Sequence, residues 1–453
     1  MQNLIRKYNV PGPRYTSYPT VPYWEEDKFT AKKWISAAQQ SFNESNLSEG
    51  ISLYIHLPFC ESMCTFCGCN KRITKNHEVE QVYIKALLKE WALYSDLLPT
   101  IPKIKEIHLG GGTPTFFSPQ NLETLIDGIF KKAVKFDENS FFSFEGHPNN
   151  TTFEHLEKLY QLGFRRVSYG IQDFDLNVQT LINRVQPFEE VKRVTEEARA
   201  IGYQSVNFDI IYGLPQQKLS SVEKTIALVK QLMPDRIAFY SYAHVPWIKG
   251  LGQRKFTTAD LPAPELKQKL YETGKELLKE SGYLEIGMDH FSLAHDSLWQ
   301  ALQSQKIHRN FMGYTESKTK LMIGLGVSSI SDSWTGFAQN VKKIEDYYKL
   351  LAENKLPVFR GHILNNEDLI IRKHILNLMC LSATDWQPGE LGENEISIHS
   401  RLENYEADGL IEKGVYHVKI TQKGKAFLRN ICMAFDTRLW RKKPETQLFS
   451  MTV

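Results

Sequence analysis

The sequence lacks any long apolar run and any large excess of charge of one sign. No stretch of about 18 consecutive apolar residues occurs, and the opening MQNLIRKYNVPG is not apolar either, so we expect neither secretion nor a membrane span. The 55 basic and 52 acidic residues are well mixed and leave a net charge of +3, which provides no electrostatic footprint for nucleic acid or an anionic membrane. We therefore expect a cytoplasmic protein with small-molecule partners. Core-forming residues are plentiful, because 42% of the 453 residues are hydrophobic and 12% aromatic, enough for two or three structural units.

Cysteine is also scarce, yet four of the six cysteines fall within ten residues, at Cys60, Cys64, Cys67 and Cys69. They follow the apolar run 51–57, which we interpret as a buried strand ended by a proline. Three thiolates spaced C-x3-C-x2-C can hold one corner of a [4Fe-4S] cluster and leave the fourth iron open. The alternatives are a zinc site, which more often uses two distant C-x2-C pairs, a disulfide framework, and a cluster closed by Cys69 as a fourth ligand.

Apolar strand-like runs alternate with helical segments from residue 51 to about residue 245, which is the pattern of parallel βαβ units. The sequence therefore predicts an α/β fold, a partial (β/α)6 TIM-like barrel that keeps its chemistry at the carboxyl ends of the strands. The expected strands lie near 51–57, 104–109, 140–145, 165–171, 206–212 and 236–242, and the expected helices within 75–97, 118–133, 152–162, 187–202, 219–232 and 263–282.

Two further segments flank this predicted barrel. The stretch 11–20 is rich in proline and tyrosine and cannot be helical, so we expect either an arm over the barrel mouth or a surface strap. Expected helices at 368–381 and 395–408, followed by a hairpin, predict a mostly helical, winged-helix-like unit. Such a unit alone would favour DNA binding, but it has no basic stripe, so we expect a lid or packing domain. The predicted domains are 1–50, 51–360 and 361–453.

Glycines and polar side chains gather where the predicted strands end. The second strand runs into Gly110–Thr113, where glycines let a ligand approach the backbone, although a turn packed for steric reasons gives the same pattern. The third strand ends at Glu145, and Gln172, Arg184 and Asp209 lie near the ends of the next two. Asp209 by itself is equally well explained as a buried carboxylate with a structural partner. Several polar groups at consecutive strand ends, however, indicate a binding site.

The cysteine motif carries a family resemblance. C-x3-C-x2-C-x-C with Tyr54 six residues ahead, the arm sequence PRYTSYP and the tail sequence NICMAFD resemble the oxygen-independent coproporphyrinogen III oxidases of the radical S-adenosylmethionine (SAM) superfamily. The resemblance implies a [4Fe-4S] cluster on Cys60, Cys64 and Cys67, with SAM on the open iron, cleaved to a 5′-deoxyadenosyl radical. The implied activity is oxidative decarboxylation of two propionates of coproporphyrinogen III to vinyl groups, which gives protoporphyrinogen IX in haem biosynthesis.

The same resemblance assigns roles to single residues. It implies Tyr54 and Glu145 as catalytic residues and two bound SAM molecules per chain. The expected SAM contacts are Tyr54, Phe66, Gly111, Gly112, Thr113, Glu145, Gln172, Arg184, Asp209, Ala243 and Ile330. In the arm, Arg14, Tyr15 and Tyr18 are expected to touch the substrate.

Some roles and partners are less closely defined. The family often has an aspartate where His147 stands, so the role of His147 is open, as is that of Cys69. The expected partners are coproporphyrinogen III and an electron donor such as flavodoxin or ferredoxin, and we expect a monomer. The rival hypotheses are a haem-binding, chaperone-like radical SAM relative and a radical methyl transferase that acts on haem. The haem-binding relatives generally lack the arm and the C-G-C ending of the cysteine motif, both of which are present here.

Overall fold

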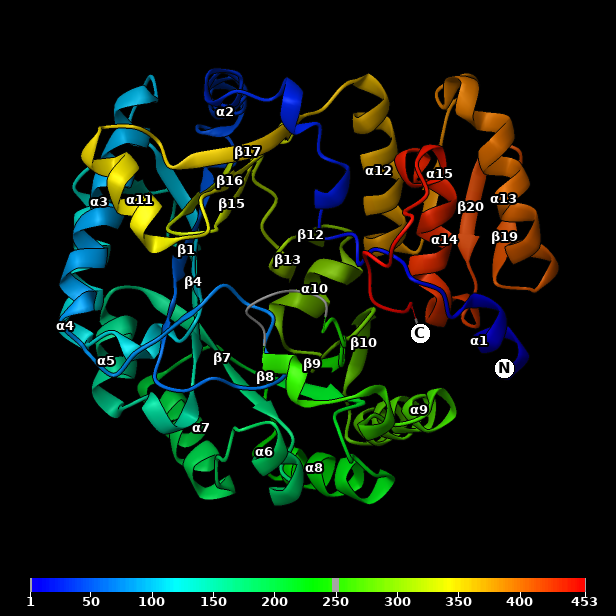
Figure 1. The fold of residues 1–453 in the computed structure, drawn as a ribbon, viewed down its shortest axis with the longest axis horizontal. Coiled ribbons are helices and arrows are strands. Elements are labelled where there is room, and N and C mark those ends of the chain that lie inside the picture. The colour runs from blue at the N-terminus through cyan, green and yellow to red at the C-terminus, as the bar shows by residue number, and fades with distance from the viewer. Residues whose placement is uncertain (1, 247–251, 453) are drawn as a thin grey trace.

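The computed structural model describes residues 2–246 and 252–452, and its largest element is a curved sheet (Figure 1). The strands lie in the order β10-β11-β9-β8-β7-β6-β4-β1-β14-β15-β16-β17, with β5 beside β4. Neighbouring strands are parallel from β9 to β14. These parallel strands are β1 (Ile51–Leu57), β4 (Lys103–Gly111), β6 (Phe141–Gly146), β7 (Phe164–Gln172), β8 (Ser205–Tyr212), β9 (Arg236–Ser241) and β14 (Met322–Leu325). All six expected strands are present, so the α/β interpretation with a parallel sheet is confirmed.

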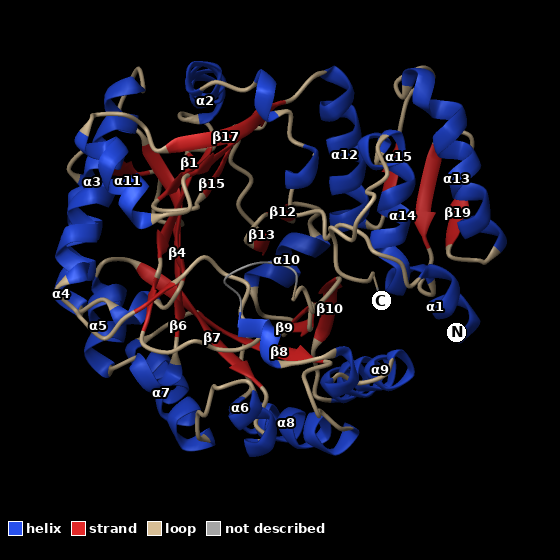
Figure 2. Ribbon diagram, viewed as in Figure 1, coloured by secondary structure: helices blue, strands red, loops and turns tan. Residues whose placement is uncertain are grey.

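Helices cover the outer side of the curved sheet (Figure 2). Because the strands are covered in this way, β1 is buried at every position, which explains its nearly continuous apolar sequence. Local signals set the helix ends: Ser118 accepts a hydrogen bond from the backbone of Asn121 at the start of α4, and Gly202 ends α7 with φ 110°. The helices are α3 (Val79–Leu97), α4 (Pro119–Phe130), α5 (Phe153–Gln161), α6 (Leu176–Leu181), α7 (Phe188–Ile201), α8 (Leu219–Leu232) and α9 (Pro264–Glu280).

Antiparallel strands that the sequence analysis did not predict extend the sheet at both ends. On one side β10 (Leu284–Gly287) and β11 (His290–Ser292) follow β9, and on the other β15 (Ile330–Asp332), β16 (Gly336–Asn340) and β17 (Val358–Ile363) follow β14. The remaining elements of this region are β2 (Phe59–Cys60), β3 (Arg72–Ile73), β5 (Val134–Lys135), α10 (Ser297–Gln303), β12 (His308–Asn310), β13 (Gly313–Thr315) and α11 (Ile344–Ala352). Strand β17 crosses the predicted domain boundary at residue 360, so a division there would cut the sheet.

The N-terminal segment is only partly the extended arm that the sequence predicts. It contains α1 (Gln2–Tyr8) and α2 (Ala31–Ser45), and α2 packs on β16 and β17. Within the arm, Tyr15 and Tyr18 are each 2% exposed, and their hydroxyls bond Asp436 and Thr437 of the C-terminal segment at 3.0 and 3.1 Å. These two tyrosines therefore pack the arm on the C-terminal unit, and the expectation that they touch the substrate stays a prediction.

The C-terminal unit has its own core and lies beside the open side of the curved sheet (Figure 1). It consists of α12 (Asn366–Leu381), β18 (Ala383–Asp385), α13 (Glu395–Ala407), β19 (Ile411–Lys413), β20 (His417–Ile420), α14 (Leu428–Phe435) and α15 (Thr437–Arg441). Its strands form an antiparallel sheet in the order β18-β20-β19, and the expected helices and hairpin are present. Within the part of the chain that the structure describes, no helix has the length and apolarity needed to cross a membrane.

Candidate active site

The cysteine loop leaves the carboxyl end of β1 and is anchored by main-chain bonds on both sides. The backbone N–H groups of Arg72 and Thr74 donate to Pro58 and Cys60, and Thr65 N donates to Ile182 O at 3.0 Å. All six cysteines of the chain are free thiols, so the disulfide alternative finds no support in the structure. The loop is thus a fixed turn that presents its cysteines at the strand ends.

Each of the three predicted iron ligands has a hydrogen-bond donor beside its sulfur. Thr113 Oγ1 lies 3.4 Å from Cys60 Sγ, and Arg184 Nη1 lies 3.6 Å from Cys64 Sγ. Burial raises the pKa of Cys60 to about 11 despite the Thr113 bond, whereas a hydrogen bond from Cys69 lowers the pKa of Cys67.

Donors around sulfur suit thiolates bound to iron. No three His, Cys, Asp or Glu side chains among the described residues stand close enough to share one ion. Three cysteine thiolates are the usual ligands of an iron–sulfur cluster, so the donor set fits one.

The glycine-rich turn after β4 packs directly against the cysteine loop. Gly112 N donates to Leu57 O at 2.8 Å, and a Cβ on Gly112 would lie 2.7 Å from the carbonyl oxygen of Pro58. Gly111 has φ 111°, and a Cβ there would lie 2.6 Å from the ring of His56. The steric reason for these glycines is therefore real, and it is also what brings Thr113 onto Cys60.

Glu145 ends β6 beside this turn and keeps its carboxylate ionised. Gly111 N donates to Glu145 Oε2 at 3.3 Å, and His108 Nε2 lies 3.4 Å from Oε1. Burial raises the pKa of Glu145, but the bonds from His108 and Gly111 and the charge of nearby histidines outweigh it, so the net pKa is lowered. Tyr54 stacks on His108 with ring centroids 6.0 Å apart and bonds His56 Nδ1 at 3.0 Å. The two predicted catalytic residues thus share one neighbour, His108.

A second polar group consists of Gln172 on β7, Asp209 on β8 and Arg184 on the loop after α6. Arg184 donates twice to the carbonyl of Gly170, at 2.8 and 3.1 Å, and has no carboxylate partner among the described residues. Asp209 accepts hydrogen bonds from Ser168 at 3.2 Å and Asn207 at 2.9 Å. Burial, with the charge of Glu145, raises the pKa of Asp209 to about 6. Gln172 ends β7 with φ 67° and is 7% exposed.

The remaining predicted contacts lie around these two groups. Phe66 of the cysteine loop packs on an apolar cluster that contains Ile182 and Tyr242, and Ala243 directly follows Tyr242 beyond β9. Ile330 begins β15, and its carbonyl oxygen would lie 2.5 Å from a Cβ on Gly324, the strand partner of Tyr54. Most of the predicted contacts therefore lie near the carboxyl ends of parallel strands or on the loops that follow them, whereas Tyr54 and Asp209 lie within β1 and β8 and Ile330 begins the antiparallel β15.

Comparison with known proteins matches the whole chain to one family. Residues 54–229 match the family model of the radical SAM superfamily. An oxygen-independent coproporphyrinogen III oxidase from Helicobacter pylori J99 is 39% identical over 441 residues, covering 96% of this chain and 95% of the relative. One from Escherichia coli K12 is 37% identical over 459 residues, with 99% and 98% covered. The chain belongs to the oxygen-independent coproporphyrinogen III oxidase family. The solved structure of coproporphyrinogen III oxidase (HemN) from Escherichia coli, described as a radical SAM enzyme, superposes with a TM-score of 0.89 at 35% identity, over 96% of this chain and 98% of that one. The radical SAM family implies a [4Fe-4S] cluster and SAM.

The site also contains residues that the sequence analysis did not single out. A polar hollow of about 170 Å³ lies inside the sheet, lined by Glu145 and Asp209 together with His108 and Tyr240. His108 follows Glu106 by two positions on β4, so both face the same side of the sheet. That alternation of polar residues in an otherwise apolar strand is the signal that could have found them.

His147, whose role the sequence left open, directly follows β6. Its Nδ1 accepts a hydrogen bond from Asn149 N at 3.2 Å and caps the short turn Pro148–Asn150. Burial, followed by the charge of Arg184, lowers the pKa of His147 to about 2, so the ring is neutral.

Proposed function

We propose that this chain catalyses the oxygen-independent oxidative decarboxylation of two propionates of coproporphyrinogen III to vinyl groups, giving protoporphyrinogen IX. The observation that carries this proposal is the full-length match to relatives of that name, together with a cysteine loop seated beside polar strand ends. For each propionate, loss of one hydrogen atom from the β-carbon, of carbon dioxide and of one electron balances to a vinyl group. No acid or base removes so weakly acidic a hydrogen.

The cofactors fit residues of this chain. When bound, a [4Fe-4S] cluster and SAM together supply the 5′-deoxyadenosyl radical that removes this hydrogen atom. Cys60, Cys64 and Cys67 would hold the cluster. Glu145 stays ionised and lies beside the glycine turn, which suits it to the ammonium of SAM, and Tyr54 stacks on His108, the neighbour that it shares with Glu145.

We further propose that a second SAM lies against Gln172, Arg184 and Asp209, which makes two per chain. Arg184 supports this assignment because it is a guanidinium without a carboxylate partner among the described residues, and a SAM carboxylate would supply one. Phe66, Thr113 and Ala243 would complete the two SAM sites, with Ile330 beside Tyr54. The enclosing sheet would keep solvent from the reacting atoms.

The architecture of the chain belongs to the same proposal. We propose that the curved parallel sheet is a partial (β/α)6 barrel and that the C-terminal unit is a winged-helix-like packing domain, with the domain boundary after β17, near residue 364. The C-terminal unit packs against the arm, and its sequence has no basic stripe for DNA. A monomer in the cytoplasm that takes electrons from a flavodoxin or ferredoxin fits this assignment.

An anaerobic assay with coproporphyrinogen III, SAM and a reductant tests the proposed function. We expect protoporphyrinogen IX, and deuterium placed on the propionate β-carbons should appear in 5′-deoxyadenosine. Full product formation with unlabelled 5′-deoxyadenosine would contradict the reaction. The methyl transferase alternative is tested by supplying haem in place of coproporphyrinogen III. If that alternative holds, the protein consumes haem and does not consume coproporphyrinogen III.

A further inference from the structure

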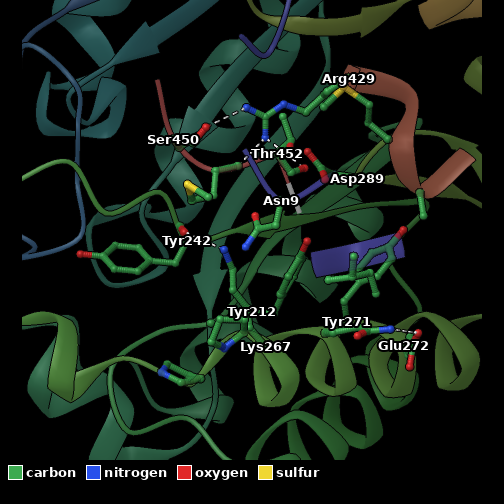
Figure 3. A pocket seen from close by; sticks show the side chains of 18 of the residues that line it. Asn9, Tyr212, Tyr242, Lys267, Tyr271, Glu272, Asp289, Arg429, Ser450 and Thr452 are labelled. Carbon is green, nitrogen blue, oxygen red and sulfur yellow. Dashed lines mark hydrogen bonds between the residues drawn. The ribbon is translucent and has the colours of Figure 1, made fainter. Parts of the chain in front are cut away.

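A second and larger cavity, of about 740 Å³, lies between α9, the ends of β8 and β9, and the C-terminal unit. Its volume falls in the range of about 300–1,000 Å³ typical of small-molecule sites. Figure 3 shows Lys267 reaching from α9 toward the backbone of Tyr242, with Arg429 and Asp289 on the wall across the cavity. None of its lining residues is among the expected SAM contacts.

The cavity carries an excess of positive charge. Of the described residues that line it, six are cationic and three acidic: Lys267, Lys275, Lys279, Lys423, Lys425 and Arg429 against Glu272, Glu276 and Asp289. Asp289 is already paired with Arg14, and Lys275 is paired with Glu285 outside the lining. The free positive charge of the inner wall therefore comes from the remaining cations.

Arg429 and Lys267 are the cations of the inner wall, and they differ in how their donors are used. The guanidinium of Arg429 donates hydrogen bonds to backbone carbonyls of the two chain ends, including those of Pro13 and Met451, so Arg429 is a structural residue. Lys267 has only the carbonyl of Tyr242, at 3.5 Å, and no carboxylate within ion-pair distance among the described residues. Burial, then the charges of Arg429 and Arg14, lowers the pKa of Lys267 to about 8. Burying half of an ammonium group near other positive charges costs free energy, and an anion bound beside it offsets that cost.

The rest of the wall is partly aromatic and suits an apolar ring system. Tyr212 and Tyr271 face the cavity with ring centroids 5.1 Å apart, and Tyr242 lines it while packing in the cluster that includes Phe66 of the cysteine loop. The cavity thus adjoins the candidate active site at the cysteine loop. It also adjoins the polar hollow, because Asp289 lines the cavity while Arg14, its partner, lies over the ring of Tyr240 in the hollow.

We propose that this cavity is a carboxylate-binding subsite for the tetrapyrrole, in which Lys267 binds a propionate that is not reacting. The proposal rests on the proposed function, since a substrate with several propionates has some to hold while another reacts. The aromatic wall takes the macrocycle, and the hollow on the other side of the Arg14 and Asp289 pair takes the reacting end. Lys267 is then a residue that sets substrate affinity and position, and it does not touch the reacting atoms.

The test compares Lys267→Met with Lys269→Met, an exposed lysine on the same helix, in the anaerobic holoenzyme. Loss of a charge-assisted bond predicts that the KM for coproporphyrinogen III rises about 10- to 100-fold in Lys267→Met, with kcat changing less than KM, while Lys269→Met stays within about twofold. Lys267→Arg should recover much of the affinity. Iron content and near-ultraviolet circular dichroism establish that each variant is folded, and Lys267→Gln replaces Lys267→Met if the latter is not.

A binding measurement separates this proposal from the proposed function. Oxidised coproporphyrin III, titrated into the holoenzyme by fluorescence, requires no turnover, and its affinity should fall by a similar factor in Lys267→Met. Equal affinity of wild type and a folded Lys267 variant for this probe would overturn the subsite. If the probe binds as predicted but wild type does not convert coproporphyrinogen III, the subsite stands and the proposed reaction fails.

Discussion

Glu90 offers a test of how the loop that carries Ile330 is held. Glu90 lies on α3 and is fully buried, and its carboxylate accepts three hydrogen bonds: from Gly326 N at 2.7 Å, from Asn340 Nδ2 at 2.6 Å and from the Tyr347 hydroxyl at 2.6 Å. These partners belong to the turn after β14, to β16 and to α11. A single carboxylate therefore joins the turn that leads to Ile330 to two other elements of the fold.

The pKa of this group fixes both the sign and the size of its effect. Burial raises the pKa of Glu90 to about 7, against the opposing effect of its three donors. Between the unfolded pKa, near 4.5, and the folded one, the folded protein holds a proton that the unfolded chain has lost, so stability falls as the pH rises. The folded pKa lies two to three pH units above the unfolded one. At about 1.4 kcal/mol for each pH unit, the free energy of unfolding falls by about 3 kcal/mol as the pH rises, and this fall is complete above pH 7.

Replacing Glu90 with Gln removes the titratable carboxyl group and keeps the shape of the side chain. At pH 5 the variant should be less stable than wild type, because an amide NH2 in place of a carboxyl oxygen faces a donor, at a cost of about 1–3 kcal/mol. That difference should shrink or reverse by pH 7.5, since only wild type then bears the buried charge.

The measurement is urea unfolding of both proteins at several pH values, with Glu157→Gln on the exposed face of α5 as the control for loss of a carboxylate. The quantity that decides is the change with pH in the stability difference between wild type and variant, in which other titrating groups cancel. Parallel profiles for wild type and Glu90→Gln from pH 5 to pH 7.5 would refute the reasoning.

Three further predictions concern the candidate site. Cys64→Ser should abolish bound iron, measured by iron content and visible absorption, whereas Cys69→Ser should keep iron and lose activity; equal loss of iron in both would disprove a three-cysteine cluster. Equilibrium binding of SAM to the anaerobic holoenzyme should reach two per chain and fall to one in Arg184→Ala, and saturation at one in wild type would remove the second site. Gly112→Ala should lose both iron and SAM binding because its Cβ has no room, whereas Gly68→Ala, with nothing within 4 Å of its Cβ, should keep them; similar behaviour of the two variants would show that the close packing of the turn is unimportant.

The parallel centre of the fold was predictable because burial leaves a direct trace in the sequence. Strands such as β1 and β8 are covered by helices and must be apolar along most of their length, and turn residues mark their ends. The same logic predicts Glu145 and Asp209 as site residues, since the carboxyl ends of parallel strands meet at one edge. The C-terminal helices were found from their 3.6-residue period for the same reason.

The antiparallel strands could not be found in this way. Strands β10, β11 and β15 have three or four residues, too few to show an alternating pattern. Strand β17 is longer, but it lies on the edge of the sheet with Phe359 exposed, so its pattern is weak and the predicted boundary fell inside it. The partners of the arm tyrosines could not be predicted for a related reason. A Pro-Tyr-rich stretch shows that it is extended, but nothing in it shows which surface it covers, and only the fold reveals Asp436 and Thr437 as the partners of Tyr15 and Tyr18.

Arg184 shows what joins the parts of the site that the sequence could only place separately. Its guanidinium donates to Gly170 O at the end of β7 and to the sulfur of Cys64, which is 120 residues away along the chain. The cysteine loop is tied to the same segment, because Asn183 Nδ2 donates to Met63 O at 2.8 Å. Asn183 and Arg184 therefore join the end of β7 to the cysteine loop. In such an arrangement the predicted second SAM and the predicted cluster are held by a shared set of contacts, so that removing Arg184 should disturb the surroundings of Cys64 even while its sulfur remains.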